Sequence, residues 1–383
     1  MLIKNANIVN ETFDIVPADI LVVGESIAKI AAPGELCSCC TAGHEVIDFS
    51  GKLIMPGFVD IHIHGCAGAD TGDATPEALE TMSKYLVTKG VTSFCPTSMT
   101  VSNEELRKIF ANVKACADKG MPGAQIVGIN MEGPYISVAK KGAQAREHIR
   151  PASVSEIREL NEIAGGLIKL VDIAPEEPNA DAFITELKDE ITISIAHTSA
   201  DYEQAKHAFD LGINHATHLF NAMSGLTHRA PGVVGAIFES DTVSPEIICD
   251  GFHINPAVLR IAFAVCGEDR TCVISDSLNA AGCPDGEYEL GGQPVFVRDG
   301  KAYMSDGITI AASTANIHVE FKNLLSYGIP FKQVIKSCTI NPAREIREDK
   351  VIGSIAEGKR ADFVVVDDNY DVVSVIVKGK KVC

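Results

Sequence analysis

The sequence lacks any apolar run that approaches the roughly 20 residues a helix needs to cross a bilayer. It also lacks tryptophan, low-complexity tracts and repeats of a fixed period. Its first residues, MLIKNANIVN, do not follow the basic, apolar and small-residue order of a signal peptide. We therefore expect no membrane-spanning segment and predict a cytoplasmic protein.

Cationic side chains are scarce. The chain has 33 Lys and Arg residues against 51 Asp and Glu, which gives a formal net charge of −18. A surface of this sign repels nucleic acid and anionic lipid, so we expect neither nucleic acid nor a membrane as a partner. A small anionic substrate would have to be bound by cations gathered at one place.

Cysteine, in contrast, occurs twelve times. A chain of 383 residues, 46% of them hydrophobic, buries enough apolar surface to fold without a disulfide framework. We therefore expect reduced thiols in a reducing compartment. The cluster CSCC at 37–40 has the composition of a metal knuckle, but no matching pair of ligands accompanies it, so we do not assign it a metal.

Both ends of the chain alternate apolar residues with Gly and Asp-Asn punctuation, as antiparallel strands do. Examples are ADILVVGESIAKIA near the start and ADFVVVDDNYDVVSVIVKGKKVC at the end. If the two ends pair, they form one small domain that brackets the rest of the chain. We predict a small β-sandwich domain from residues 1–54 and 346–383.

Between these ends, strand-like apolar runs alternate with segments of helical spacing. In one such segment, TPEALETMSKYLVTKG, the first Thr is placed as an N-cap and the Gly as a terminator. Eight strand–helix units over residues 55–345 are what a (β/α)8 TIM-like barrel requires, and we predict this α/β fold. A doubly wound open sheet is the alternative. The runs are 57–65, 91–98, 124–133, 167–176, 192–197, 215–220, 246–253 and 272–277.

The first run, GFVDIHIHG, places His62 and His64 two positions apart in an apolar strand. Residues i and i+2 of a strand lie on the same face, so both rings point into one small space. A single buried histidine is usually bonded to a backbone carbonyl, and that alternative remains for each ring alone. Because one divalent cation satisfies two converging imidazoles together, we predict a metal site.

Four more polar residues lie at or near the carboxyl ends of predicted barrel strands, where such barrels carry their catalytic groups: Glu132, His197, His218 and Asp276. With the first pair they provide four imidazoles and two carboxylates. This set suits Zn²⁺ or Fe²⁺ better than Mg²⁺ or Ca²⁺, and Mn²⁺ and Co²⁺ accept similar ligands. His215, three residues before His218, is predicted to face away from the group.

The motifs at these positions resemble the amidohydrolase superfamily and, more closely, its N-acetylglucosamine-6-phosphate deacetylase family. They are PGFVDIHIHG, MEGPY, AHTSA, THLFNAM, DGFH and ISDS. The run THLFNAM followed by HRAPGVVG and DGFH is specific to the deacetylase family, whereas the two-histidine strand marks only the superfamily. The resemblance covers the whole chain, including GSIAEGKRADFVVVD near its end.

This resemblance implies removal of acetate from N-acetylglucosamine 6-phosphate by a divalent metal. It implies one ion that is always present, held by Glu132, His197 and His218. Some relatives lack histidines on the first strand and use one ion, whereas this chain has both. A second ion, with Glu132 as the bridging carboxylate, is therefore expected at His62, His64 and Asp276. We expect one or two ions per chain.

The resemblance also implies the substrate contacts. A fixed-charge arginine, Arg229, is expected to reach the phosphate in the neighbouring subunit of a homodimer. In this chain Gln144 stands where many relatives have histidine, and the loop IAASTANIH replaces a commoner version. The remaining contacts are expected from Ala143, Gln144, Asn221, Ala222, Asp250, Gly251, His253, Ala311, Ala312 and Ser313.

Asp276 is the candidate general base. Amide hydrolysis needs a nucleophile, an activated carbonyl and a proton for the leaving amine, and a divalent metal lowers the pKa of water from about 16 towards 7. A carboxylate beside a cation has a low pKa, so Asp276 starts ionised, as a base must. The alternative is that Asp276 only binds metal.

Three other functions remain open on the sequence. Deacetylation of N-acetylgalactosamine 6-phosphate differs from the expected reaction at one sugar hydroxyl. Another amidohydrolase, such as a cyclic-amide hydrolase or a D-aminoacylase, would keep the metal ligands without the LFNAM and HRAPG motifs. A non-catalytic metal-bearing sugar-phosphate sensor would not need Asp276 as a base.

Overall fold

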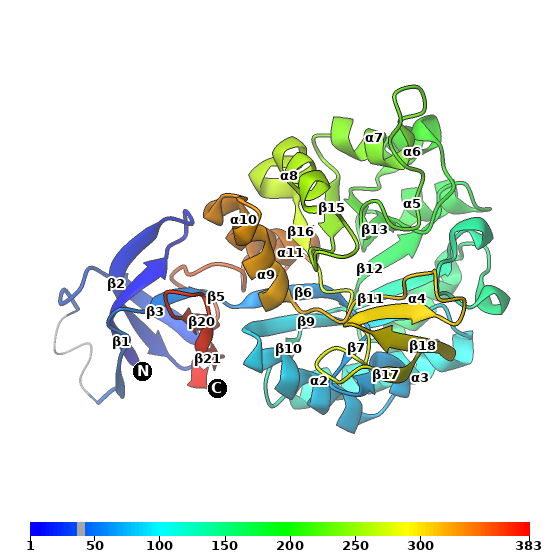
Figure 1. Ribbon diagram of the computed structural model, residues 1–383. Coiled ribbons are helices and arrows are strands. Elements are labelled where there is room, and N and C mark those ends of the chain that lie inside the picture. Colours follow the sequence, from blue (N-terminus) through cyan, green and yellow to red (C-terminus); the bar gives the residue numbers. More distant parts are fainter. Residues whose placement is uncertain (37–42) are drawn as a thin grey trace.

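The computed structural model describes residues 1–36 and 43–383, so the CSCC cluster at 37–40 lies outside the described residues. Figure 1 shows a larger part, in which helices surround a group of strands, and a smaller part made of strands from both ends of the chain. Among the described helices, none combines the length and apolar character that crossing a membrane requires.

Eight parallel strands form a barrel in the larger part. Each pairs with the next in chain order, and β10 (Gln125–Ile126) adds to β9. Backbone bonds close the ring, because the Asp276 N–H donates to the His62 carbonyl and the His64 N–H to the Ser277 carbonyl, both at 2.9 Å. The predicted (β/α)8 barrel is confirmed. Its strands are β6 (Phe58–Ile63), β9 (Val91–Ser98), β11 (Ile129–Tyr135), β12 (Ile168–Ile173), β13 (Thr192–Ile195), β14 (His215–Ala216), β15 (Ser244–Ile247) and β16 (Cys272–Val273).

Helices cover the outside of the barrel (Figure 1). The α-helices are α2 (Pro76–Thr88), α3 (Asn103–Lys119), α4 (Val154–Ile163), α5 (Ala180–Leu187), α6 (Tyr202–Leu211), α7 (Gly232–Glu239), α8 (Pro256–Arg270), α9 (Ile317–Ser326), α10 (Phe331–Ser337) and α11 (Ile340–Glu345). Short 3-10 helices are η1 (Thr71–Asp73), η2 (Val138–Lys140) and η3 (Arg146–His148).

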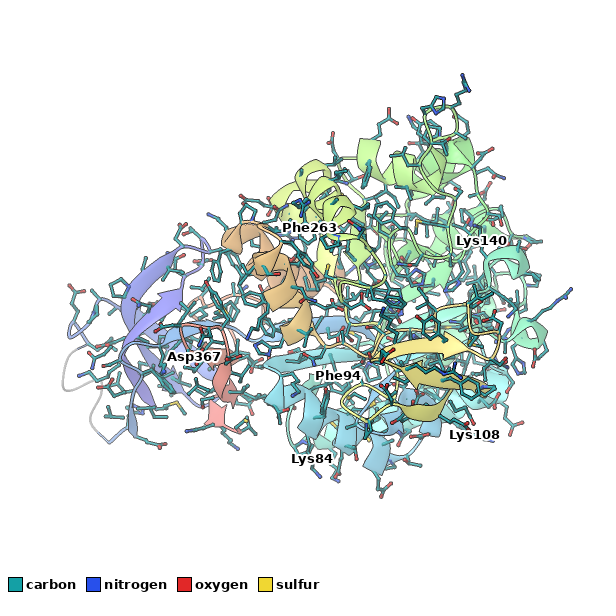
Figure 2. The ribbon with its side chains drawn as sticks, viewed as in Figure 1. Lys84, Phe94, Lys108, Lys140, Phe263 and Asp367 are labelled. Atoms are coloured by element: carbon teal, nitrogen blue, oxygen red, sulfur yellow. The ribbon has the colours of Figure 1, made fainter. Side chains whose placement is uncertain are left out.

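Helix α2 illustrates how the sequence sets these elements. The Thr75 hydroxyl accepts the Ala78 N–H, as predicted for an N-cap. Leu79, Met82 and Leu86, spaced by three and four positions, are buried against the barrel. Figure 2 shows the result for the larger part, with Phe94 and Phe263 inside it and Lys84 and Lys108 at its periphery.

The smaller part is a sheet built from both ends of the chain. Its order is β22-β21-β20-β5-β1-β2-β3, and β4 also pairs with β1. Because β1 pairs with β4 at its start and β5 at its end, the sheet splits and folds over a separate core. The predicted β-sandwich is confirmed. The strands are β1 (Leu2–Val9), β2 (Ile15–Val23), β3 (Ser26–Ala31), β4 (Val46–Asp48), β5 (Leu53–Pro56), β20 (Phe363–Val366), β21 (Val372–Val377) and β22 (Lys380–Lys381).

The domain boundaries at 54/55 and 345/346 stay a prediction. β5 pairs with β20 as far as Pro56, so the terminal sheet extends two residues beyond the first predicted boundary. A second feature was not predicted at all. Three antiparallel strands follow the eighth barrel strand, and Leu290 and Val295 pack there against Met99. They are β17 (Gly286–Leu290), β18 (Gln293–Arg298) and β19 (Lys301–Met304), while the short strands β7 (Gly65–Cys66) and β8 (Ala69–Asp70) follow β6.

Candidate active site

The six predicted ligands meet at the carboxyl end of the barrel. His62 lies on β6, and Glu132 lies on β11. The backbone at three of the others has positive φ angles of 43°, 31° and 44°, at His197, His218 and Asp276 respectively. A non-glycine residue in this region costs of order 1–3 kcal/mol and is typical of functional sites. The chain is therefore held in a strained conformation that turns these side chains inward.

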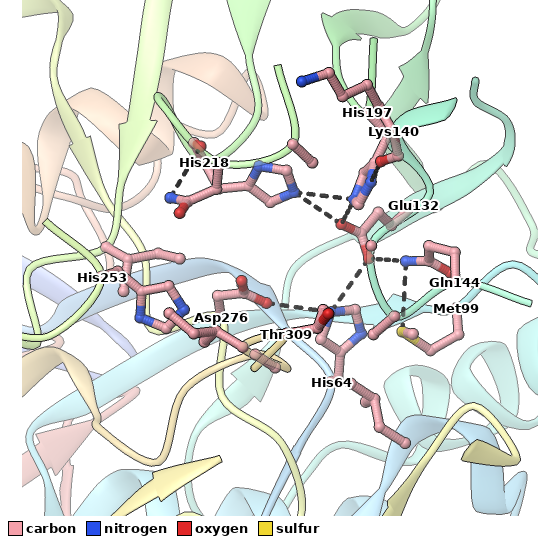
Figure 3. Close-up of a pocket in the computed structure, with 18 of the residues that line it drawn as sticks. His64, Met99, Glu132, Lys140, Gln144, His197, His218, His253, Asp276 and Thr309 are labelled. Carbon is pink, nitrogen blue, oxygen red and sulfur yellow. Dashed lines mark hydrogen bonds and ion pairs between the residues drawn. The ribbon is translucent and has the colours of Figure 1, made fainter. Parts of the chain in front are cut away.

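Glu132 lies at the centre of the group, as Figure 3 shows. Its Oε1 lies 3.0 Å from the Nε2 of His197 and 3.1 Å from the Nε2 of His218. Its Oε2 lies 3.3 Å from the Nε2 of His64. One carboxylate thus faces histidines that follow three different strands, β6, β13 and β14, which is the geometry a bridging ligand needs.

The first-strand histidines and Asp276 form the second group. The Nε2 atoms of His62 and His64 lie 3.6 and 3.3 Å from Asp276 Oδ1. His62 Nε2 is also 3.7 Å from Glu132 Oε1. The ligand atoms of this group all lie within 4.8 Å of one another, as do those of Glu132, His197 and His218. The six residues therefore form two adjacent sets of three donors.

The donor set fits a divalent metal. His62 Nε2 is buried without a hydrogen-bond partner among the described residues, although it faces two carboxylates. Its Nδ1 meets Glu246 Oε2 at 2.9 Å, and His197 Nδ1 meets the Lys140 carbonyl at 2.8 Å. Such contacts to the second nitrogen direct Nε2 toward a metal. Imidazole and carboxylate donors together suit a transition-metal ion.

Charge keeps the two carboxylates ionised. Burial would raise the pKa of Glu132, but bonds from His197, His218 and His64 hold it well below its usual range. The pKa of Asp276 is also lowered, against the effect of burial, because His62 and His64 face it. For His64, burial would lower the pKa, yet Asp276 and Glu132 raise it to about 10. The negative charge of Glu132 and Asp276, which raises the pKa of His64, also attracts a metal cation.

Five of the six predicted ligands, all except His62, line a cavity of about 300 Å³, a volume suited to a small molecule. Most of the ligand set and part of the predicted substrate set reach it (Figure 3). The predicted substrate residues on its wall are Ala143, Gln144, Asn221, Ala222, His253 and Ala312. The wall does not include Arg229, Asp250, Gly251, Ala311 or Ser313.

Two predicted substrate residues that do not line the cavity, Asp250 and Ser313, are linked by hydrogen bonds to the lining residue His253. The Asp250 carboxylate meets the Nδ1 of His253 at 2.8 Å and accepts the Ser313 hydroxyl at 3.2 Å. It therefore orients the His253 ring at the cavity. Arg229 is exposed in the segment between β14 and α7 and is not among the residues that line the cavity of its own chain.

Sequence reasoning missed several residues of the site. Lys140, whose carbonyl meets His197 Nδ1, is the one lysine or arginine among the described residues that line the cavity. Its position in KKGAQ, beside a predicted substrate motif, was an available signal. Met99, Leu290 and Thr309 also line the cavity, but they come from segments that carry no recognisable motif.

Comparisons with known proteins agree with this geometry. A sequence profile of the amidohydrolase family matches residues 53–382, and the chain belongs to this family. It is 38% identical over 333 residues to the N-acetylglucosamine-6-phosphate deacetylase of Bacillus subtilis, covering 86% of this chain and 84% of that relative. The predicted resemblance to these deacetylases is confirmed.

Other relatives extend the comparison. The N-acetylgalactosamine-6-phosphate deacetylase of Escherichia coli O157:H7 is 32% identical over 337 residues, covering 88% of this chain and 89% of that protein. The solved N-acetylglucosamine-6-phosphate deacetylase of Pasteurella multocida aligns with a TM-score of 0.92 at 31% identity, over 99% of this chain and 98% of that one. A mutant N-acetyl-D-glucosamine-6-phosphate deacetylase of Mycobacterium smegmatis, solved in complex with N-acetyl-D-glucosamine-6-phosphate, also aligns with a TM-score of 0.92. Its identity is 28%, and the alignment covers 100% of this chain and 99% of that one.

Proposed function

We propose that this chain hydrolyses the acetamide of N-acetyl-D-glucosamine 6-phosphate to D-glucosamine 6-phosphate and acetate, in amino-sugar catabolism. The observation that carries the proposal is the pair of adjacent three-donor groups at one small cavity, with Glu132 of one group also facing His62 and His64 of the other. Relatives named for this reaction match most of the chain, at 38% identity for the Bacillus subtilis enzyme. The chain is thus a hydrolase of a linear amide.

Two divalent ions are the proposed cofactors. Glu132, His197 and His218 would hold one of them. The other would lie at the first strand, on His62, His64 and Asp276. Zn²⁺ and Fe²⁺ fit the mixed imidazole and carboxylate donors best, followed by Mn²⁺ and Co²⁺. When bound, such an ion lowers the pKa of water and polarises the acetyl oxygen.

Asp276 is the proposed general base and general acid. It lines the cavity, so water and substrate can reach its carboxylate, and its lowered pKa keeps it ionised before the reaction. It takes a proton from the attacking water as the bond from water oxygen to acetyl carbon forms. It returns the proton to the amide nitrogen as the carbon–nitrogen bond breaks, which releases a neutral amine and acetic acid, and the acid then loses its proton to water to give acetate.

The phosphate group of the substrate is proposed to bind to cavity residues that follow the sixth and seventh barrel strands. Asn221 and Ala222 follow the sixth barrel strand and offer a side-chain amide and a backbone N–H. His253, held by Asp250, offers its second ring nitrogen. Lys140, another lining residue, donates its Nζ to the Met223 carbonyl at 3.2 Å, and its charge would help to meet the requirement that an acidic protein gather positive charge locally. Of the other predicted contacts, Ser313 would act through Asp250, to which its hydroxyl donates at 3.2 Å, and Gly251 and Ala311 do not line the cavity.

The contacts of Gln144 favour a role other than polarising the acetyl carbonyl. Its Nε2 donates to Glu132 Oε2 at 2.6 Å, and its Oε1 accepts the Thr100 N–H at 2.7 Å. Both ends of the amide are therefore engaged, and the side chain is buried. We propose that Gln144 holds the bridging carboxylate in place.

A homodimer is proposed to complete the phosphate site. Arg229 is exposed and does not line the cavity of its own chain, so its side chain is available to the site of a second chain. A guanidinium offers a fixed charge and paired donors that match a phosphate. Complementation tests this directly. Mixing R229A chains with D276N chains should restore activity only if Arg229 acts in trans, because some mixed dimers then contain one intact site.

A cytoplasmic location is proposed because the cysteines in the described part of the chain form no disulfides. Nine cysteines in the described part of the chain are free, which suits a reducing compartment. The same acidic surface argues against nucleic acid and anionic membranes as partners.

One alternative substrate has a specific observation in its favour. The Escherichia coli relative named for N-acetylgalactosamine 6-phosphate is 32% identical to this chain and matches at similar length. Acetate release should be measured in parallel from both hexosamine phosphates and from unphosphorylated N-acetylglucosamine. A higher kcat/KM for N-acetylglucosamine 6-phosphate supports the proposal. A higher kcat/KM for N-acetylgalactosamine 6-phosphate would support the alternative substrate instead. Acetate release from neither hexosamine phosphate would refute both functions.

A further inference from the structure

A line of buried charged side chains runs inward from the metal site, and the reaction proposed above does not use it. Glu246 on β15 meets the Nδ1 of His62 at 2.9 Å through Oε2. Its Oε1 meets the Nε2 of His215, on β14, at 3.1 Å. The Nδ1 of His215 then meets Oε2 of Glu345, at the end of α11, at 3.2 Å. We call these three residues, Glu246, His215 and Glu345, the Glu246 relay.

Burial makes the relay costly. Glu246 and His215 have no exposed surface, and Glu345 is nearly buried. Taking charges out of water costs several kcal/mol for each ion, and apolar residues of similar volume often replace a buried ion pair without loss of stability. Packing alone therefore gives no reason to place an acid and a histidine inside the barrel. Their contact with a metal ligand provides one.

The relay fixes the orientation of His62. Because Glu246 Oε2 is a carboxylate oxygen, the Nδ1 of His62 must carry the proton and donate it. The Nε2 atom then faces Asp276 Oδ1 and Glu132 Oε1, at 3.6 and 3.7 Å. Carboxylates that hold the second nitrogen of a metal-binding histidine in this way raise metal affinity, and their loss typically costs about 10–100-fold.

The relay also connects the two ligand groups. The same Oε2 of Glu246 accepts the backbone N–H of His218 at 3.3 Å, at a residue whose φ is +31°. His215 holds the Glu246 carboxylate from the other side. Both of its ring nitrogens face carboxylate oxygens, so both act as donors, and the ring cannot turn without losing a bond.

We infer that Glu246, braced by His215 and Glu345, is a positioning residue that makes the first-strand histidines a competent metal site. The inference rests on the proposed two-ion function and adds the reason why the second ion binds. Glu246 does not touch substrate. It acts through the ring of His62.

Zn²⁺ titration of chelated protein by calorimetry, with elemental analysis of the loaded protein, tests this inference. The E246Q variant keeps the size of the side chain and removes its charge. H62N removes the ligand itself and identifies which binding step belongs to the first strand. E320Q is the matched control, because Glu320 is a fully buried acid on α9 whose carboxylate oxygens have no hydrogen-bond partner among the described residues.

The wild-type chain should bind two Zn²⁺ ions, and E246Q should weaken by about 10–100-fold the same step that H62N abolishes. The other step should change much less, and E320Q should leave both steps intact. A purely structural role would weaken both steps or neither. Equal affinities in E246Q and wild type, an equal loss in E320Q, or one ion per wild-type chain would each overturn the inference.

A second variant covers the case in which E246Q does not accumulate. H215Q removes the brace and leaves Glu246 in place, so it should weaken the first-strand step by a smaller factor, and no change in that step would overturn the inference. The proposed function is tested separately. If the wild-type protein binds two ions but releases no acetate from a hexosamine phosphate, the function fails while the positioning role stands.

Discussion

The Nε2 atoms of His197 and His218 lie 3.1 Å apart, and both lie within 3.1 Å of the same oxygen of Glu132. The Nδ1 of His197 meets the Lys140 carbonyl at 2.8 Å, so its Nε2 is the ring nitrogen that faces Glu132 and His218. Two imidazole nitrogens and a carboxylate oxygen that converge in this way are donors that a transition-metal ion takes. This relationship supports a metal site independently of any relative.

Metal binding should release protons. The pKa values of His62, His64 and His218 are all raised by neighbouring carboxylates, which favours the protonated rings, whereas a ligating nitrogen must give its proton up. Apparent Zn²⁺ affinity should therefore rise with pH, up to the pKa of His64 at about 10. Calorimetry in buffers of different ionisation enthalpy measures the protons. A binding enthalpy that does not depend on the buffer would contradict this expectation.

Replacing Asp276 by Asn should abolish most turnover. The variant keeps a ligand oxygen but cannot accept the water proton, so kcat should fall by about 10²–10⁴-fold with KM within a few-fold. D172N is the control, because Asp172 is a buried barrel acid that accepts the Thr217 hydroxyl outside both ligand groups. Near-normal kcat in D276N with metal content retained would leave Asp276 as a ligand only.

Replacing Gln144 by Leu separates its two candidate roles. The change removes the donor to Glu132 and leaves the Thr100 N–H unpaired, so the free energy of unfolding should fall by about 1–3 kcal/mol and Zn²⁺ affinity should fall with it. Denaturant unfolding and metal titration measure these effects. If instead only kcat falls, with stability and metal affinity intact, Gln144 polarises the acetyl carbonyl.

Replacing Arg229 by Ala should raise KM for N-acetylglucosamine 6-phosphate far more than for unphosphorylated N-acetylglucosamine. The guanidinium pairs with phosphate and has no partner on the neutral sugar. R260A is a matched control, because Arg260 is an exposed arginine on α8. Equal effects of R229A on both substrates would refute phosphate recognition by this residue.

Much of the barrel could be predicted because its strands are buried on all sides. Such strands appear as short apolar runs, and six of the runs contain a strand of the barrel within their bounds, among them β6 and β12. The other two strands overrun the predicted bounds by two residues, as β11 does at Tyr135. Polar residues near the ends of these runs had no role in the core, which is why the ligands stood out.

The rest of the site could not be predicted because it depends on distant parts of the chain. Nothing local to Glu246 reveals His62, which is 184 positions away, or His215. His215 was predicted to face away from the ligand group on the assumption that its strand continues to His218. β14 contains only His215 and Ala216, and the chain then turns before His218. His215 therefore lies outside both ligand groups and contacts the Glu246 carboxylate through Nε2.

The central claim is that the two ligand groups hold divalent ions that this chain uses to remove acetate from a hexosamine phosphate. Acetate release from N-acetylglucosamine 6-phosphate should be measured on protein that has been fully chelated and then on the same sample reloaded with Zn²⁺ or Fe²⁺. We predict loss of turnover on chelation and its recovery with one of these ions, up to two per chain. Undiminished acetate release from the metal-free protein would contradict the account.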